Sequence, residues 1–253
     1  MNDQISFLAL SLGQQVNYTN SAGNPDYQDN YTLTAGTRIV YKKEKFGASL
    51  NAYYQLGSTN TWPANSVSAY NFCLDVFYKI AKPLKLSVGF EMLSGQSQTD
   101  TTASYLSTNH AFNPYFGTNH KFNGLMDYFF VGNHIGSVGL NDAYLRLDYK
   151  HKKFNLGLTG HALLANTDIL DAAWLASNGE IRALSPYMGM ELDFFGGFNL
   201  APGAAVKFGY SQMLGTASME AIKGGDSGEI ANWGWVMVTF KPTLFDQSAQ
   251  KKK

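Results

Sequence analysis

The feature that most constrains the fold is an alternation of apolar and polar residues along most of the chain. Residues 46–56 read FGASLNAYYQL, where apolar Phe46, Ala48, Leu50, Ala52, Tyr54 and Leu56 alternate with Gly47, Ser49, Asn51, Tyr53 and Gln55. The same period returns in residues 31–42, 71–80, 84–92, 142–150, 154–164, 188–195 and 205–211. A period of two places side chains on opposite faces of a β-strand. With residues 5–18 and 233–240 added, the sequence predicts an all-β chain of about ten strands.

The composition suits a sheet with one wet face. Charged residues make up 15% of the chain and the mean hydropathy is -0.19, whereas about a quarter of a typical soluble domain is charged. The formal net charge is zero, so we expect no nucleic-acid partner. Cys73 is the single cysteine, which excludes a disulfide within the chain. No apolar run reaches the ~20 residues of a membrane helix, and the stretch MNDQISFLALSLGQQ lacks the basic start and continuous apolar run expected of a signal peptide.

The connections between predicted strands alternate in length. KKEK, AKP, HKK and GGFNLAPG are short, whereas the connections near 19–30, 57–69, 96–139, 165–184 and 215–231 are long and polar. Short turns on one rim and long loops on the other are typical of outer-membrane barrels. We therefore predict a transmembrane antiparallel up-and-down β-barrel in the bacterial outer membrane, as one domain over residues 1–253. Membrane lipid and lipopolysaccharide would contact its apolar face, and an even strand count would put both termini on the periplasmic, short-turn side. The alternative is a soluble sandwich or lipocalin-like barrel, whose apolar face would point inward.

The charged residues of the wet face are the candidate pore-lining groups, because charged rings and constrictions set selectivity in channels. They are Arg38, Asp75, Glu91, Asp142, Arg146, Asp148, His161, Glu191, Asp193 and Lys207. The alternative for each is that it only braces the wall through ion pairs between strands. Lysines near the short turns, such as Lys42, Lys79, Lys85 and Lys150, could instead extend toward lipid headgroups.

The longest connection carries the most distinctive stretch. Its pieces are FNPY at Phe112–Tyr115, TNHKFNG at Thr118–Gly124, MDYF at Met126–Phe129 and GLND at Gly139–Asp142. Together with the terminal WGWVMVTFKP, they resemble the alginate-export family of outer-membrane barrels in its Bacteroidetes-type version. The match covers about a quarter of the chain.

The resemblance implies a porin-like channel that passes or exports a polar or anionic solute, such as a polysaccharide or oligosaccharide. Barrels of that family are usually larger, so the chain is either a self-contained barrel of about ten strands or the C-terminal part of a larger one. We expect the 96–139 loop to fold over or into the lumen as a constriction. Its candidate residues are Phe112, Tyr115, His120, Phe122, Asp127 and Tyr128. Alternatively, the aromatic side chains pack the loop only on itself.

Other chemistry is less well supported by the residues. His161 lies on the wet face near serine and threonine residues, which makes an outer-membrane hydrolase the alternative function, although no nucleophile motif accompanies His161. A structural or adhesin barrel is the third function that we consider. His110, His120 and His134 are spaced unlike known metal motifs, which favours hydrogen bonding within an ordered loop over a metal site. We predict a non-enzyme with no cofactor. WGWVMVTFKPTLF resembles the final strand that the barrel-assembly machinery recognises, which makes that machinery an expected partner.

Overall fold

The computed structural model describes residues 3–115, 117, 123–134 and 136–241. Its main element is an 11-stranded sheet in which β6 contributes only two residues, so ten long strands remain, as predicted. The strands are β1 (Gln4–Thr19), β2 (Pro25–Lys42), β3 (Phe46–Ser58), β4 (Ser66–Ala81), β5 (Leu84–Leu93), β6 (Thr108–Asn109), β7 (Leu140–His151), β8 (Phe154–Leu164), β9 (Tyr187–Ala201), β10 (Ala204–Gly215) and β11 (Ala231–Phe240).

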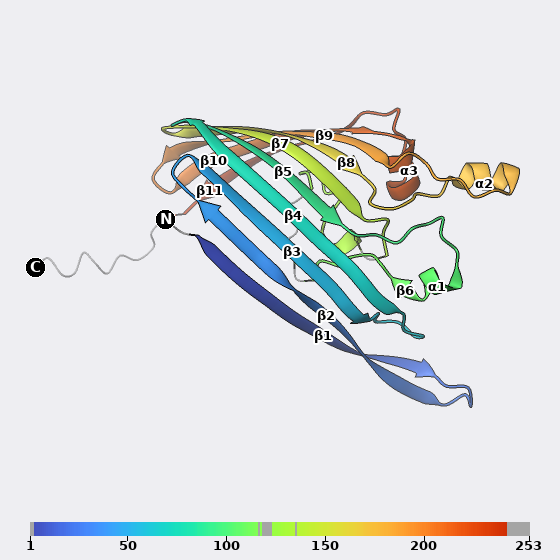
Figure 1. Cartoon of the computed structure of the whole chain (residues 1–253). Helices are drawn as coiled ribbons and strands as arrows, with labels where there is room; N and C mark the ends of the chain where they lie inside the picture. Colours follow the sequence, from blue (N-terminus) through green and yellow to red (C-terminus); the bar gives the residue numbers. More distant parts are fainter. Residues whose placement is uncertain (1–2, 116, 118–122, 135, 242–253) are drawn as a thin grey trace, which may run out of the picture.

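Each long strand pairs antiparallel with the next long strand along the chain, which confirms the up-and-down topology. The short β6 pairs parallel with β4 outside this path. The sheet curves strongly, with β1 and β11 as its two edges, and within the described residues it is not closed (Figure 1). The start of β1 and the end of β11 lie on the rim formed by the short turns, and the three α-helices lie on the other rim (Figure 1).

The exposed apolar side chains identify the outer face of the curved sheet. Leu145 and Leu158, from the apolar sets of their strands, are 56% and 51% exposed. On the opposite face, Asp142 and Asp193 are almost fully buried. This is the reverse of a soluble sandwich or lipocalin, and it confirms the predicted sidedness of the wall.

Glycines of the inner face make room for aromatic rings from the neighbouring strand. A Cβ at Gly89 would lie 2.4 Å from the ring of Tyr144, and one at Gly157 would lie 2.2 Å from the ring of Phe195. Each ring therefore covers a glycine of the preceding long strand in the sheet. This close fit explains why glycine recurs on the wet face.

The connections differ from the sequence prediction in two places. The expected long loop at 19–30 is a tight hairpin of residues 20–24, since β1 and β2 pair as far as Thr19 and Pro25, and the Asn20 side chain accepts the amides of Ala22 and Asn24. Most of GGFNLAPG, predicted as a connection, belongs to β9, which continues to Ala201. The long connections also carry α1 (Ala103–Leu106), the 3-10 helix η1 (Val131–Asn133), α2 (Ala172–Asn178) and α3 (Ala217–Lys223). None of the helices in the described residues is long and apolar enough to span a membrane.

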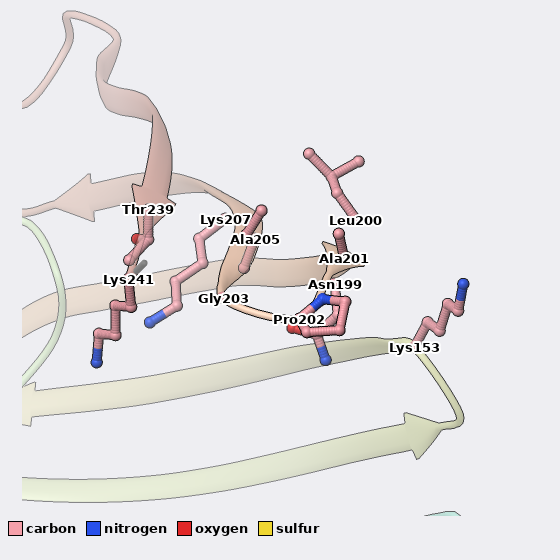
Figure 2. Close-up of a pocket in the computed structure, with 11 residues that line it drawn as sticks. Lys153, Asn199, Leu200, Ala201, Pro202, Gly203, Ala205, Lys207, Thr239 and Lys241 are labelled. Atoms are coloured by element: carbon pink, nitrogen blue, oxygen red, sulfur yellow. The ribbon is translucent and has the colours of Figure 1, made fainter. Parts of the chain in front are cut away.

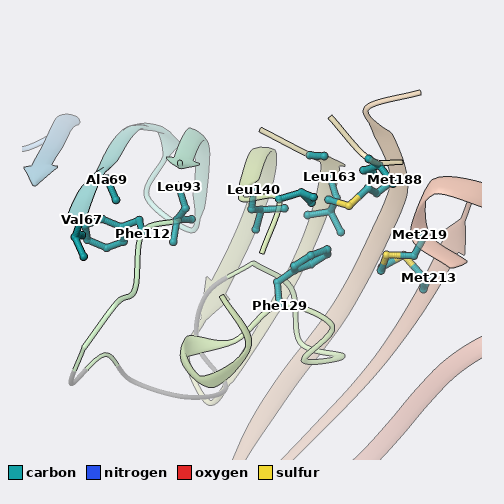
Figure 3. Packing of buried hydrophobic residues seen from close by; sticks show 13 residues of the cluster. Val67, Ala69, Leu93, Phe112, Phe129, Leu140, Leu163, Met188, Met213 and Met219 are labelled. Atoms are coloured by element: carbon teal, nitrogen blue, oxygen red, sulfur yellow. The ribbon is translucent and has the colours of Figure 1, made fainter. Parts of the chain in front are cut away.

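A hydrophobic core fills the loop end of the concave face. The inward residues Leu93, Leu140 and Leu163 are almost completely buried there. Phe112 and Phe129 of the long connection pack against this wall, with Phe112 beside Leu93 and Phe129 directed toward Leu163 (Figure 3). The connection between β5 and β7 therefore packs on the sheet rather than only on itself.

Candidate functional site

The candidate site is the long β5–β7 connection where two anchors hold it against the concave face, at Asn113 and at Leu125–Met126. The first anchor is Gln55 on β3, whose side chain is 1% exposed. Its Oε1 accepts the backbone amide of Asn113 at 2.9 Å, and its Nε2 donates to the backbone oxygen of Asn113 at 2.6 Å. The same amide also donates to Thr34 Oγ1 at 2.9 Å. Gln55 thus pairs with the loop backbone as a neighbouring strand would.

The second anchor is Glu191 on β9, a fully buried side chain. Its Oε1 accepts the backbone amides of Leu125 and Met126 at 2.6 and 2.8 Å. The chain reaches this position through Asn123 and Gly124, which have φ values of 60° and 96°. Asn and Gly are the residues that most readily adopt such positive φ values. A Cβ at Gly124 would lie 2.4–2.6 Å from the Glu191 carboxyl group, so only glycine allows this approach.

The Asn123 side chain binds a second part of the wall. Its Nδ2 donates to Glu91 Oε2 on β5 at 3.0 Å and to Asp142 Oδ2 on β7 at 3.1 Å. Glu91 is also bound through its other oxygen by Asn71 Nδ2 at 3.0 Å. The side-chain amide of Asn123 therefore lies between two acidic side chains of neighbouring strands. Its hydrogen bonds reduce the free-energy cost of holding these two carboxyl groups close together.

His161 lies beside this cluster, between two carboxyl groups. Its Nδ1 is 2.9–3.0 Å from both oxygens of Asp142, and its Nε2 is 3.7 Å from Asp193 Oδ2. The nearby hydroxyl of Ser211 donates to Asp193 Oδ1 at 2.5 Å. A base of the Ser-His-Asp type needs a hydroxyl nucleophile at its second ring nitrogen, and here that nitrogen faces a carboxyl group.

In the described part of the chain, no segment of a long loop is bonded to the short-turn half of the concave face. Arg146 donates through Nε and Nη2 to Asp148 Oδ1, at 2.9 and 2.8 Å, and its guanidinium lies 4.7 Å from the ring centre of Phe195. Lys85 Nζ is 2.9 Å from Asp148 Oδ2. Two cations therefore share one carboxylate, and their partly exposed side chains remain within reach of a solute.

The predicted pore-lining residues thus fall into two groups. Glu91, Asp142, His161, Glu191 and Asp193 lie under or beside the crossing loop, and all but the half-buried Glu91 are buried there. Arg38, Asp75, Arg146, Asp148 and Lys207 lie nearer the short turns. Arg38 donates to Asn51 Oδ1 at 3.0 Å, and Asp75 accepts from Ser49 at 3.4 Å, so neighbouring strands are bridged there too. That these residues line a conducting pore stays a prediction.

The predicted constriction residues have different environments. Phe112 is in the hydrophobic core, Tyr128 packs against that core, and Tyr115 is half-buried. Asp127 adopts a positive φ of 57°. His120 and Phe122 lie outside the described residues.

His134 in the same connection is 3% exposed and stacks with Phe129 at 6.4 Å between ring centres. Burial, with a smaller contribution from the charge of Lys223, lowers the pKa of His134 to about 4. Lys223 of α3 lies 4.4 Å from the ring centre of Phe129, and its own burial lowers its pKa to about 8. The loop is therefore packed around a neutral imidazole at neutral pH.

Sequence reasoning missed the residues that hold the loop in place. Gln55, Asn71 and Asn123 bind through amide groups, which have no characteristic spacing. A signal for the buried zone did exist, since Leu163 interrupts the polar face of 155–161 with an apolar residue close to the loop rim.

Comparisons with known proteins show no family for the chain. No family model matches the chain, and no curated protein matches it. Among solved structures, the chain is similar to the NanC porin in a rhombohedral crystal form, with 9% identity, a TM-score of 0.43, and coverage of 95% of this chain and 99% of that chain.

Proposed function

We propose that the chain forms the wall of an outer-membrane channel through which a polar or anionic solute, such as an oligosaccharide, diffuses passively. The observation that carries the proposal is the loop tethered across a polar concave face, inside a wall whose outer face is apolar. A sheet in hydrocarbon leaves no edge unpaired. The proposal therefore requires β1 and β11 to be paired in the membrane, with each other or with further strands.

The crossing loop is proposed as the constriction. Its two anchors are on β3 and β9, which are separated in the sheet by β4, β5, β7 and β8. A segment fixed to both narrows the space between them, and its position depends on side chains of the wall. The family resemblance of the TNHKFNG stretch supports the same function, because that motif ends at Asn123 and Gly124, the residues that bring the loop to Glu91, Asp142 and Glu191.

Single-channel recording in planar bilayers tests the proposal. The purified protein should give ohmic current steps, and Asn123→Ala should give larger or noisier steps, because the loop loses its contacts with Glu91 and Asp142. Asn178→Ala is the matched control, since within the described residues the Asn178 side chain bonds only locally, to the Trp174 oxygen of α2. A folded protein that gives no current would refute the channel, and equal steps in both variants would refute the constriction.

An outer-membrane hydrolase is the second candidate, favoured by the 2.9–3.0 Å contact of His161 with Asp142. An ionised carboxylate in this position would orient the imidazole and strengthen it as a base. Esterase or protease activity that is lost in His161→Ala, in a protein that gives no current, would favour this candidate over the channel.

A further inference from the structure

The charges of the chain are segregated along the strand direction, although their sum is zero. The rim of the short turns and the strand ends next to it carry Lys42, Lys43, Lys45, Lys79, Lys82, Lys85, Lys150, Lys152, Lys153, Lys207 and Lys241, with Asp3, Glu44 and Asp148 as the acids. The opposite rim carries Asp26, Asp29, Asp100, Asp127, Asp168, Asp171, Glu180, Glu220, Asp226 and Glu229, with Arg182 and Lys223 as the described cations. The short-turn rim is therefore the positive end of the wall.

A pocket lies at this positive rim, around the turn between β9 and β10. Its volume is about 650 Å³, and its lining includes Lys153, Asn199, Lys207, Thr239 and Lys241. The lining contains no acidic residue of the described chain. In Figure 2 the side chains of Lys207 and Lys241 extend the same way from neighbouring elements, whereas the Lys153 side chain extends away from them, from the β7–β8 turn.

Lys207 lies on the concave face of the wall, and the Lys241 side chain extends the same way from the end of β11 (Figure 2). Lys207 alternates with Phe208 and lies on the same face as Ser211, whose hydroxyl reaches Asp193 of the concave cluster. Lys241 follows β11 and bonds through its backbone amide to the Gly203 oxygen at 2.7 Å, which holds it at the turn. Within the part of the chain that the structure describes, Lys153, Lys207 and Lys241 form no ion pair, in contrast to Lys85.

We propose that this pocket binds the anionic groups, phosphate or carboxylate, of a soluble solute at the periplasmic mouth of the channel. The inference rests on the proposed function and deepens it by naming the charge of the solute and the rim where it first binds. Lys207 and Lys241, which have no acidic partner among the described residues, supply the attraction, and Lys153 adds positive charge at the edge of the pocket. The side chains of Asn199 and Thr239 add hydrogen-bonding groups in the same pocket.

Calorimetric titration of the protein in zwitterionic detergent with tripolyphosphate tests binding without reference to conduction. The variant K153Q/K207Q/K241Q should bind about tenfold more weakly or worse, as the loss of three partly screened charge contacts implies. The control K45Q/K79Q/K82Q removes the same charge from the β2–β3 turn, the end of β4 and the β4–β5 turn of the same rim. Equal weakening in the two variants would overturn the proposal, because it would show a diffuse rim potential instead of a pocket.

A second titration separates a soluble anion from a lipid headgroup. In nanodiscs that contain phosphatidylglycerol, an inward-facing pocket keeps its affinity for tripolyphosphate, whereas a headgroup site is already occupied and loses it. Loss of affinity there would overturn the proposal. Bilayer recording of the wild type then shows which claim fails: current without tripolyphosphate binding refutes the pocket alone, and binding without current refutes the channel alone.

Discussion

Substitution of Gly124 by alanine is the sharpest test of how the loop is held. The added methyl group would lie 2.4–2.6 Å from the atoms of the Glu191 carboxyl group, well inside van der Waals contact. Either Glu191 or the loop must move. Both movements lengthen the hydrogen bonds from the Leu125 and Met126 amides to Glu191 Oε1, now 2.6 and 2.8 Å.

The expected cost has two parts. Alanine at the φ of 96° found at Gly124 is disfavoured by ~1–2 kcal/mol. Loss of the two amide hydrogen bonds to a fully buried carboxyl group adds about 1–3 kcal/mol. The free energy that holds the second anchor should therefore fall by about 2–5 kcal/mol in total. The hydrogen-bond part of this loss belongs specifically to the Glu191 contact.

Amide hydrogen exchange of residues 123–127 measures this loss directly, because Leu125 and Met126 donate to Glu191. Gly136→Ala is the matched control, since Gly136 also has a positive φ, 64°, but a Cβ there would meet nothing within 4 Å. We expect exchange at Leu125 and Met126 to be faster in Gly124→Ala than in Gly136→Ala by roughly fivefold to a hundredfold, the equivalent of the carboxyl part of the cost.

Equal exchange at Leu125 and Met126 in the two alanine variants would refute the reasoning, because it would mean that backbone conformation alone accounts for the effect. Heat-modifiable mobility in gel electrophoresis serves as the folding control, because a variant that keeps the mobility of the folded protein has not lost the whole sheet. The argument then concerns only the second anchor, since Gln55 holds Asn113 independently.

Three further predictions follow from the same contacts. Gln55→Leu should release the first anchor, because it removes three hydrogen bonds from a buried position at a free-energy cost of ~1.5–3 kcal/mol. Hydrogen exchange at the Asn113 amide should then be faster by a factor of ten or more. Acidification should loosen the loop around His134, because the pKa of His134 is about 4 in the folded protein and 6.5 in the unfolded chain. The stabilisation that the neutral imidazole contributes is therefore fully present above pH 6.5 and is lost as the pH falls toward 4, by up to ~3 kcal/mol. Proteolysis of the loop against pH would show this dependence, and it should disappear in His134→Asn. Leu145→Arg on the outer face should destabilise the folded protein in lipid by ~2–4 kcal/mol in urea titrations, whereas Ser49→Arg, which faces inward opposite Asp75, should cost much less.

The wall could be predicted from the sequence because hydrocarbon and water impose a strict period of two on it. Leu145 and Leu158 are exposed and Asp142 is buried, as their places in the alternation required. The hairpin of residues 20–24 was predicted too long, because the polar residues from Asp26 to Asn30 were assigned to a loop, whereas they continue the strand pair beyond the apolar band. Polarity marks the end of the apolar band but not the end of the strand.

The loop anchors could not be predicted from spacing. Leu125 and Met126 reach Glu191 across 66 and 65 residues through backbone amides, which every residue but proline possesses. What the sequence did contain was the Asn123–Gly124 pair, which favours positive φ values. That pair indicates a turn, but only the fold shows which carboxyl group lies against it.

The anchored loop also changes which charges a solute can meet. Asp142, Glu191 and Asp193 are at most 2% exposed, and their oxygens accept hydrogen bonds from Asn123, Leu125 and Ser211. Acidic groups that are buried and hydrogen-bonded in this way contribute little to the electrostatic potential in solution, whereas exposed lysines contribute in full within a Debye length. A chain with equal numbers of acidic and basic residues therefore presents an uncovered concave face whose accessible charge is mainly positive. For the channel that we propose, selectivity for anions should therefore depend on the loop remaining anchored, and releasing the loop should reduce this selectivity even where it widens the channel.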